Sequence, residues 1–71
     1  MYTLTAITPY TAYPVGTYPT IALCEEDCEA RYKVRKLKFK WSEDAWRAVV
    51  PGEEGAIVLK LTEVKDASLD S

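Results

Sequence analysis

The sequence predicts one small α+β domain, in which an antiparallel sheet is covered by a single helix at about residues 26–36. The chain has 71 residues, too few for two domains, because each hydrophobic core needs roughly 50 residues or more. Both ends of the sequence alternate apolar and polar residues, as strands do, and the segment between them spaces its apolar residues as a helix does. We expect the folded domain to span residues 1–64 and residues 65–71 to form a frayed polar tail.

Two strands are predicted in the N-terminal third. Residues 2–8 are rich in β-branched and aromatic side chains, which favour extended backbone. Residues 9–16 contain enough proline and glycine to predict an irregular connection or a wide hairpin loop. The second strand is expected at about residues 17–24. Pro19 places it at a sheet edge, because proline has no N–H to donate to a neighbouring strand.

The segment that follows fits a helix best. Ala30, Val34 and Leu37 lie at spacings of four and three, which places them along one side of a helix. Acidic residues crowd the start of this segment and basic residues its later turns, an arrangement that complements the helix dipole. The competing interpretation is a strand, because Tyr32 and Val34 also alternate with basic residues. A strand here would make the whole domain an all-β, five-stranded small barrel.

A three-stranded antiparallel meander is predicted for the C-terminal half. Its strands span residues 37–41, 46–50 and 56–64. The polar segment 42–45 connects the first two strands, so Trp41 and Trp46 are expected to face each other across the pair. The second connection is predicted as a turn at residues 51–55, with Pro51 at its first central position.

The expected core consists of apolar residues on the inward faces of these elements. They are Leu4, Ile21, Leu23, Ala30, Val34, Leu37, Phe39, Trp46, Ala48, Ile57, Leu59 and Leu61. A chain this short buries only about 60% of the surface that it exposes when unfolded, so its stability depends on few contacts.

The charge composition argues against catalysis and against general binding of polyanions. The formal net charge is −2 and the chain contains no histidine, whereas nucleic-acid-binding domains are commonly basic. Without histidine the chain lacks the commonest general base and the commonest nitrogen ligand for metals. It also has no glycine-rich phosphate loop and no nucleophile beside a base. We therefore expect a non-enzymatic protein that uses no cofactor and no metal.

The two cysteines, Cys24 and Cys28, are interpreted as small half-buried side chains. A zinc site normally takes four cysteine or histidine ligands, and this chain offers two. A redox pair of the thioredoxin type has two residues between its cysteines, and here there are three. Two cysteines are also too few for a disulfide framework, and the sequence shows no signal peptide or membrane span. The expected location is the cytoplasm.

Charge is distributed unevenly along the chain. Residues 1–24 contain no charged side chain, while residues 25–71 contain all 20. Burying a neutral surface against a partner requires no desolvation of ions. Tyrosine adds a large contact area at low entropic cost, so Tyr10, Tyr13 and Tyr18 are the predicted protein-binding residues. The alternative is that these residues form a lid over the protein's own core.

A basic run at residues 31–40 is the second candidate site. Its six basic side chains are Arg31, Lys33, Arg35, Lys36, Lys38 and Lys40. Such side chains contact nucleic-acid phosphates, and the aromatic residues among them would stack on bases. The same alternation is also typical of a solvated strand face, or of a surface that meets an acidic protein partner.

Together these features favour a small protein-binding module that docks on a macromolecular partner. In size and composition the chain is similar to inhibitors and host-modulating proteins carried by phages and mobile elements, including proteins that block bacterial defence complexes. One alternative is an accessory domain that binds RNA or DNA through the basic run. Another is a homodimer in which an N-terminal edge strand pairs with its twin.

Overall fold

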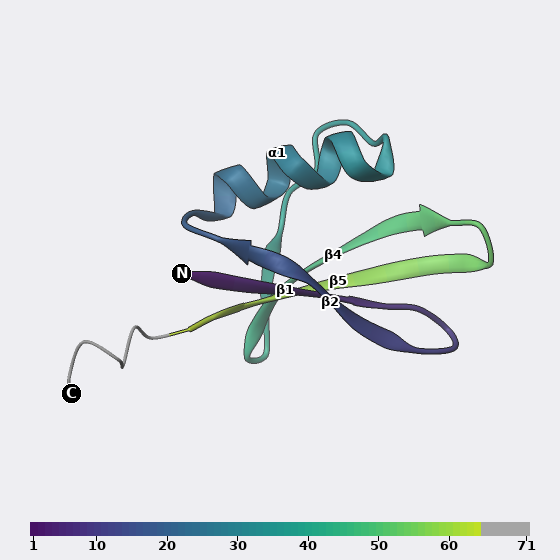
Figure 1. Ribbon diagram of the computed structural model, residues 1–71, viewed down its shortest axis with the longest axis horizontal. Helices are drawn as coiled ribbons and strands as arrows, with labels where there is room; N and C mark the ends of the chain where they lie inside the picture. Colours follow the sequence, from purple (N-terminus) through teal and green to yellow (C-terminus); the bar gives the residue numbers. More distant parts are fainter. Residues whose placement is uncertain (65–71) are drawn as a thin grey trace.

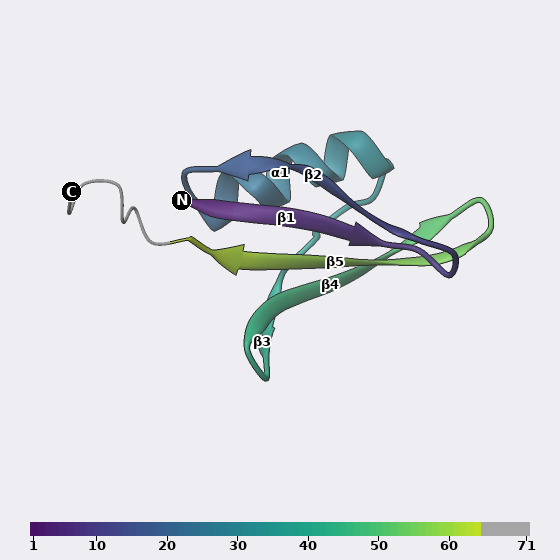
Figure 2. The ribbon, with the colours of Figure 1, turned by 60° about the horizontal axis from the view of Figure 1, so that its bottom comes forward.

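The computed structural model describes residues 1–64, which form five strands and one helix (Figure 1). The elements are β1 (Tyr2–Ile7), β2 (Ala12–Tyr18), α1 (Ile21–Tyr32), β3 (Lys40–Ser42), β4 (Ala45–Gly52) and β5 (Gly55–Glu63). All strand pairs are antiparallel, in the open order β2-β1-β5-β4-β3, and α1 lies across one face of the sheet (Figure 2). The predicted α+β class is confirmed, and the closed barrel is not formed. The predicted tail, residues 65–71, lies outside the described residues.

Strand β1 is an interior strand, second from one edge of the sheet, although it is the first element of the chain. It pairs with β2 on one side and with β5 on the other, so Leu4 lies opposite both Gly16 and Leu61. Leu4 and Ala6 are completely buried. The predicted first strand is confirmed, and so is the C-terminal meander of β3, β4 and β5.

The connection between β1 and β2 is shorter than predicted. The hydroxyl of Thr8 donates to the carbonyl of Thr11 at 3.0 Å and accepts the N–H of the same residue at 3.0 Å. These bonds close the loop within four residues, so the predicted irregular connection at 9–16 is wrong, and β2 occupies most of that range. Pro14 is compatible with β2 because one side of this edge strand needs no donor.

Helix α1 begins and ends several residues earlier than the predicted range 26–36, and the predicted strand at 17–24 is largely wrong. Thr20 caps the helix, because its hydroxyl accepts the N–H of Leu23 at 3.1 Å. Lys33 ends it in the left-handed region, with φ 57°. Of the residues after Thr20, Ile21 is β-branched and favours a strand, but Ala22 and Leu23 are strong helix formers, so local propensity agrees with a helix once Thr20 caps it. Among the described residues, no helix has the length and apolar composition needed to cross a bilayer.

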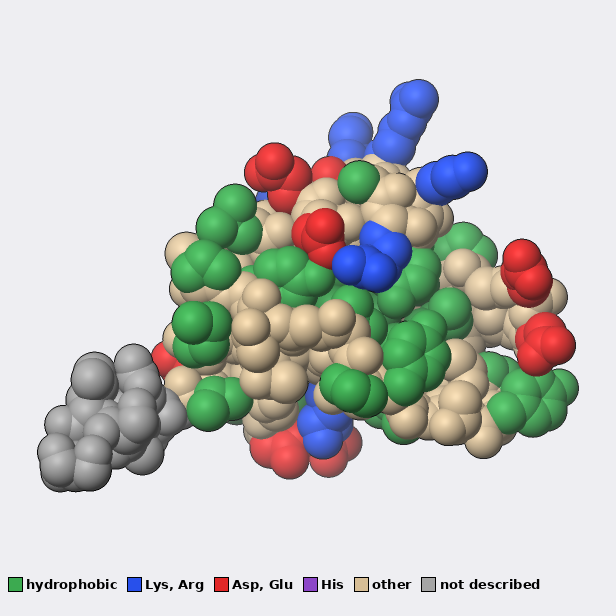
Figure 3. Space-filling view, viewed as in Figure 1, with side chains coloured by type: hydrophobic (Ala, Val, Ile, Leu, Met, Phe, Trp, Pro, Cys, Tyr) green, Lys and Arg blue, Asp and Glu red, His purple; other side chains and the backbone are tan. Residues whose placement is uncertain are grey.

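The hydrophobic core lies between α1 and the sheet, and hydrophobic side chains are visible where the two meet (Figure 3). Its buried members are Leu4, Ala6, Cys24, Cys28, Leu37, Phe39, Ala48, Val50, Leu59 and Leu61. The predicted core residues Leu23 and Ala30 are exposed instead. A helix that begins at Ile21 turns Cys24 and Cys28 toward the sheet, so its buried stripe differs from the predicted one. The remaining predicted core residues are buried or half-buried.

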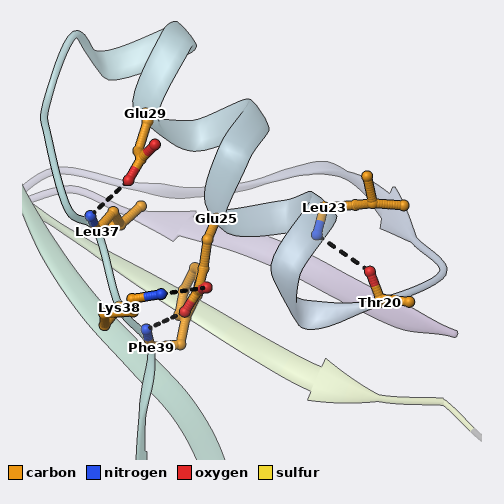
Figure 4. Close-up of polar contacts among 7 residues, drawn as sticks. All are labelled: Thr20, Leu23, Glu25, Glu29, Leu37, Lys38 and Phe39. Atoms are coloured by element: carbon orange, nitrogen blue, oxygen red, sulfur yellow. Dashed lines mark hydrogen bonds and ion pairs between the residues drawn. The ribbon is translucent and has the colours of Figure 1, made fainter.

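Strand β3 is much shorter than the strand predicted at residues 37–41. The chain before it is held against the helix (Figure 4). Glu29 accepts the backbone N–H of Leu37 at 2.9 Å, and Glu25 accepts that of Phe39 at 2.9 Å. These bonds satisfy donors that a strand would direct to its neighbour, while both apolar side chains remain buried. Leu37 and Phe39 are therefore buried as predicted, but Trp41, which the alternation places on the same side, is 58% exposed, and the backbone before β3 is irregular.

Both C-terminal hairpins turn over two residues. The first turn is at residues 43–44, and the second is at residues 53–54, closed by the pair of Gly52 and Gly55. Gly55 has a φ of 131°, which side chains rarely allow. Pro51 lies within β4, so its predicted place in the turn is wrong. It is tolerated there because β3 has already ended, and this side of β4 needs no donor.

Candidate binding surfaces

The structure gathers most of the uncharged N-terminal segment into one hairpin at a sheet edge. Strands β1 and β2 and the loop between them, residues 2–18, contain no charged side chain, and we call them the neutral hairpin. β2 is the outer strand, so within the described residues one side of the hairpin has no neighbouring strand. An uncharged strand edge is a surface on which another chain can pair.

Two of the three predicted binding tyrosines are exposed, and the third is not. Tyr10 lies in the loop of the neutral hairpin with 76% of its surface exposed, and Tyr13 in β2 is 42% exposed. At the other end of β2, the hydroxyl of Tyr18 donates to Asp27 of α1 at 2.5 Å. Burial and this carboxylate raise the pKa of Tyr18 above its usual range. Tyr18 therefore joins β2 to the helix and packs on the protein's own core, as the lid alternative expected.

The face of the sheet opposite α1 carries a row of apolar side chains that the sequence analysis missed. The row consists of Ala12, Ile7, Val58 and Val49, aligned across β2, β1, β5 and β4. Within this row Val49 is more exposed than Ile7, with 63% of its surface exposed against 36%. Alternation within each strand signals this face, but the neighbours across the sheet depend on the strand order.

A second row on the same face is cationic. It consists of Lys60 on β5, Arg47 on β4 and Lys40 on β3, which are opposite one another in the register. The guanidinium of Arg47 reaches back over the turn, where it donates to the carbonyl of Ser42 and lies 3.4 Å from the carboxylate of Asp44. Arg47 therefore has a carboxylate partner, whereas Lys40 and Lys60 form no ion pair with any residue from 1 to 64.

The predicted basic residues follow the end of α1 and the loop after it, where Lys and Arg side chains project from the molecule (Figure 3). Two of the six have carboxylate partners: Arg31 lies 3.4 Å from Asp27, and Lys38 lies 3.8 Å from Glu25. Asp27 also raises the pKa of Arg31. The other four form no ion pair within the described part of the chain; they are Lys33, Arg35, Lys36 and Lys40. The six residues are thus distributed over a helix, a loop and a strand.

The two tryptophans meet across the β3-β4 hairpin, as predicted from the sequence. Trp41 lies opposite Trp46, and their rings pack edge to face with centroids 4.6 Å apart. Trp46 also contacts Tyr2 edge to face, at 5.6 Å between centroids. Trp46 is half-buried by these contacts, whereas 58% of the surface of Trp41 is exposed.

A pocket of about 350 Å³ lies between the tips of the β1-β2 and β4-β5 hairpins. Tyr10 lines it from the first tip, and Glu53 and Glu54 line it from the second. The tips pack closely, because a Cβ atom added to Gly55 would lie 3.2 Å from Cγ of Pro9. The exposed Tyr10 therefore borders a concave surface.

Cys24 and Cys28 are completely buried free thiols. Burial, together with the neighbouring Cys28, raises the pKa of Cys24 to about 12, and burial also raises the pKa of Cys28. Such thiols are protonated near neutral pH, and it is the thiolate that attacks substrates and binds metals. Residues 1–64 contain no cluster of three potential metal ligands. Both cysteines are therefore core side chains, and the half-buried position expected from the sequence is wrong.

Comparison of the chain with models of protein families, with curated proteins and with solved structures finds no match. The surfaces of the protein are therefore the indication of its function. Two stand out at opposite edges of the sheet: the neutral hairpin with the pocket at its tip, and the basic loop beside β4.

Proposed function

We propose that this protein is a non-enzymatic binding module that docks on a partner protein through the loop end of the neutral hairpin. The observation that carries the proposal is the position of Tyr10, which is 76% exposed and lines the pocket between the hairpin tips. Tyrosine in such a place buries a large area when a partner binds, and it loses little side-chain freedom. Tyr13, on the α1 side of the sheet, and Ile7, on the opposite side, add exposed surface at the same end of the hairpin.

The absence of charge in the neutral hairpin supports the same site. No ionised side chain of the hairpin loses its water when a partner covers it, so docking avoids a cost of several kcal/mol for each ion. Glu53 and Glu54 border the pocket from the facing hairpin. Charges at a rim mainly select the partner and speed association. We therefore expect a partner with basic groups around the contact.

A small module that covers part of a larger surface acts by blocking or reshaping it. The proposal therefore includes the inhibitor or host-modulating role inferred from size and composition, of the kind carried by phages and mobile elements against bacterial defence complexes. The neutral hairpin would be the part of the protein that occupies the target.

Site-specific photocrosslinking in the native host tests this proposal. Benzoylphenylalanine replaces Tyr10 in one protein and Val64, which is exposed beyond the opposite end of β1, in a control. We expect a crosslink to a distinct protein from position 10 and none from position 64. The recovered partner is then titrated with the wild type, Tyr10→Ala and Val64→Ala. Tyr10→Ala is expected to weaken binding at least about tenfold, which is the loss of one interface anchor.

The outcomes separate the proposal from its alternatives. Because Tyr10 is exposed, its replacement by alanine should leave thermal stability unchanged, so weaker binding would not reflect unfolding. Equal affinity of Tyr10→Ala and the wild type would refute the proposed site. Crosslinks from position 10 to a second copy alone would replace it with a homodimer.

A further inference from the structure

A groove runs between the loop that follows α1 and the outer edge of β4. Glu29 and Glu25 create it, because they hold the backbone N–H groups of Leu37 and Phe39 against the helix (Figure 4). The loop is therefore drawn away from the sheet. As a result β3 begins only at Lys40, and its pairing with β4 extends no further than Arg47.

Strand β4 continues beyond this last partner. It pairs with β5 as far as Gly52, so residues 48–52 have a neighbouring strand on one side only within the described chain. Alternate residues of an antiparallel strand direct their backbone groups to the same side. Val49, two residues after Arg47, therefore offers its N–H and C=O to the groove. Pro51 offers only its carbonyl.

The lining of the groove is strongly basic. Its volume is about 420 Å³, and its charged side chains are Arg35, Lys36, Lys38, Lys40 and Arg47, with no acidic residue among those that line it. Lys38 and Arg47 each lie near one carboxylate outside the groove, at 3.8 Å and 3.4 Å. The other three form no ion pair within residues 1–64. Val34 and Val49 add apolar contacts between the charges.

This combination fits an extended peptide better than a nucleic acid. Proteins that hold single strands present aromatic side chains on which the bases stack, and no aromatic residue lines this groove. A peptide instead uses an open strand edge for its backbone hydrogen bonds and pockets for alternate side chains. Acidic side chains on such a peptide would meet Lys36 and Lys40, which form no ion pair within residues 1–64.

We propose that this groove binds an extended acidic segment of a partner protein, which adds as a strand beside β4 and places its carboxylates against the basic loop. The site lies at the opposite edge of the sheet from β2. It is therefore independent of the docking proposed for the neutral hairpin, and each site can fail without the other.

The test is an NMR titration of the ¹⁵N-labelled full chain with a peptide of about ten residues that alternates glutamate and valine. We expect saturable shift changes centred on the Val49 amide and residues 34–40, and weaker binding as salt is added. A peptide of the same sequence with N-methylated valines keeps its charge but loses backbone donors. The N-methylated peptide is expected to bind at least tenfold more weakly. A peptide that alternates lysine and valine is expected not to bind.

A matched pair of double variants locates the charges. The double variant Lys36→Gln with Lys40→Gln is expected to bind the glutamate and valine peptide at least tenfold more weakly than the wild type. Lys33→Gln with Lys60→Gln removes the same charge outside the groove and is expected to change affinity less than twofold. Absence of binding at millimolar peptide, shift changes elsewhere on the protein, or equal binding of the N-methylated peptide would each overturn the proposal. An oligothymidine of equal charge that binds the same residues more tightly would identify the groove as a nucleic-acid site instead.

Discussion

The carboxylate of Glu29 accepts the backbone N–H of Leu37 at 2.9 Å, so the helix determines the path of the loop that follows it. Glu25 does the same for Phe39, one turn earlier in the helix (Figure 4). Both bonds are partly buried, and a carboxylate acceptor strengthens them. The helix thereby supplies to this segment the acceptors that a neighbouring strand supplies elsewhere in the sheet.

Replacing Glu29 by alanine should therefore lower the free energy of unfolding by about 1–3 kcal/mol, because it leaves the N–H of Leu37 without its partner. Glu29→Gln keeps an acceptor oxygen, so it should lower the free energy of unfolding by less than Glu29→Ala does. Urea denaturation followed by tryptophan fluorescence measures both variants. Glu26→Ala is the control, since this residue is exposed on the same helix and should change stability by no more than about 0.5 kcal/mol. Equal losses at positions 26 and 29 would contradict the assigned role.

The bond between Tyr18 and Asp27 should be visible as a stability difference. Tyr18→Phe keeps the ring but removes the hydroxyl, and we expect a loss of about 1–2 kcal/mol. Tyr10→Phe removes a hydroxyl from an exposed ring and should have no measurable effect. Thermal unfolding of the two variants provides the comparison. If Tyr18→Phe left the thermal stability unchanged, the bond would contribute nothing to holding β2 against the helix.

Stability should fall in alkaline solution. Burial raises the pKa values of Cys24, Cys28, Tyr18 and Tyr32 above their ordinary values, which are 9.0 for the thiols and 10.0 for the phenols. Above those values the unfolded chain has lost protons that the folded protein still holds, so proton release favours unfolding. The free energy of unfolding should therefore be insensitive to these groups below about pH 9 and decrease as the pH rises above it. Urea denaturation between pH 7 and 11 measures the trend, and a flat profile would argue against burial of these groups.

The thiols of Cys24 and Cys28 should react with a disulfide reagent only when the protein unfolds. Both are completely buried and protonated near neutral pH, and reaction requires an accessible thiolate. We expect almost no reaction of the native protein with Ellman's reagent in minutes, and two equivalents in urea. Rapid reaction of either thiol in buffer would show that the helix does not stay packed on the sheet.

Two glycines should respond differently to the same substitution. A Cβ atom at Gly52 would lie 2.6 Å from the carbonyl oxygen of Gly55, which is backbone and must shift. At Gly16 the nearest atom is the Tyr18 hydroxyl oxygen at 4.0 Å, an ordinary contact. Gly52→Ala is therefore expected to lower the melting temperature by several degrees, as a loss of about 1 kcal/mol does in a domain of this size. Gly16→Ala should have a neutral or slightly stabilising effect, and the reverse order would contradict the turn geometry.

Much of the sheet could be predicted from local pattern alone. β1 and β5 alternate clearly, and Leu4, Leu59 and Leu61 are buried as that alternation requires. The helix boundary was missed because the β-branched Thr20 and Ile21 suggest a strand, although Ala22 and Leu23 are good helix formers. The deciding contact is the hydroxyl of a single capping residue, Thr20. The loop before β3 was missed because acceptors from another element hold its backbone, and alternation within a segment does not reveal them.

The candidate surfaces divide in the same way. The sequence shows directly that the segment around Tyr10 and Tyr13 carries no charge. Both side chains are exposed, as a binding surface requires. The partner of Tyr18 is nine residues away on another element, and no motif marks the pair. The groove beside β4 joins the loop after α1 to residues 47–49, and only the strand order brings these segments together.

The interior position of β1, between β2 and β5, bears on how the protein is made. Tyr2 pairs with Glu63, so the inner side of the first strand finds its partner only after the last strand has been synthesised. Until then the nascent chain can form the β1-β2 hairpin but leaves two uncharged strand edges open to other chains. Pairing over so long a stretch of chain is intrinsically slow. Chaperone binding at the ribosome and a tendency to aggregate on overexpression are therefore expected of this topology, and fusion of a soluble partner before Met1 should reduce both.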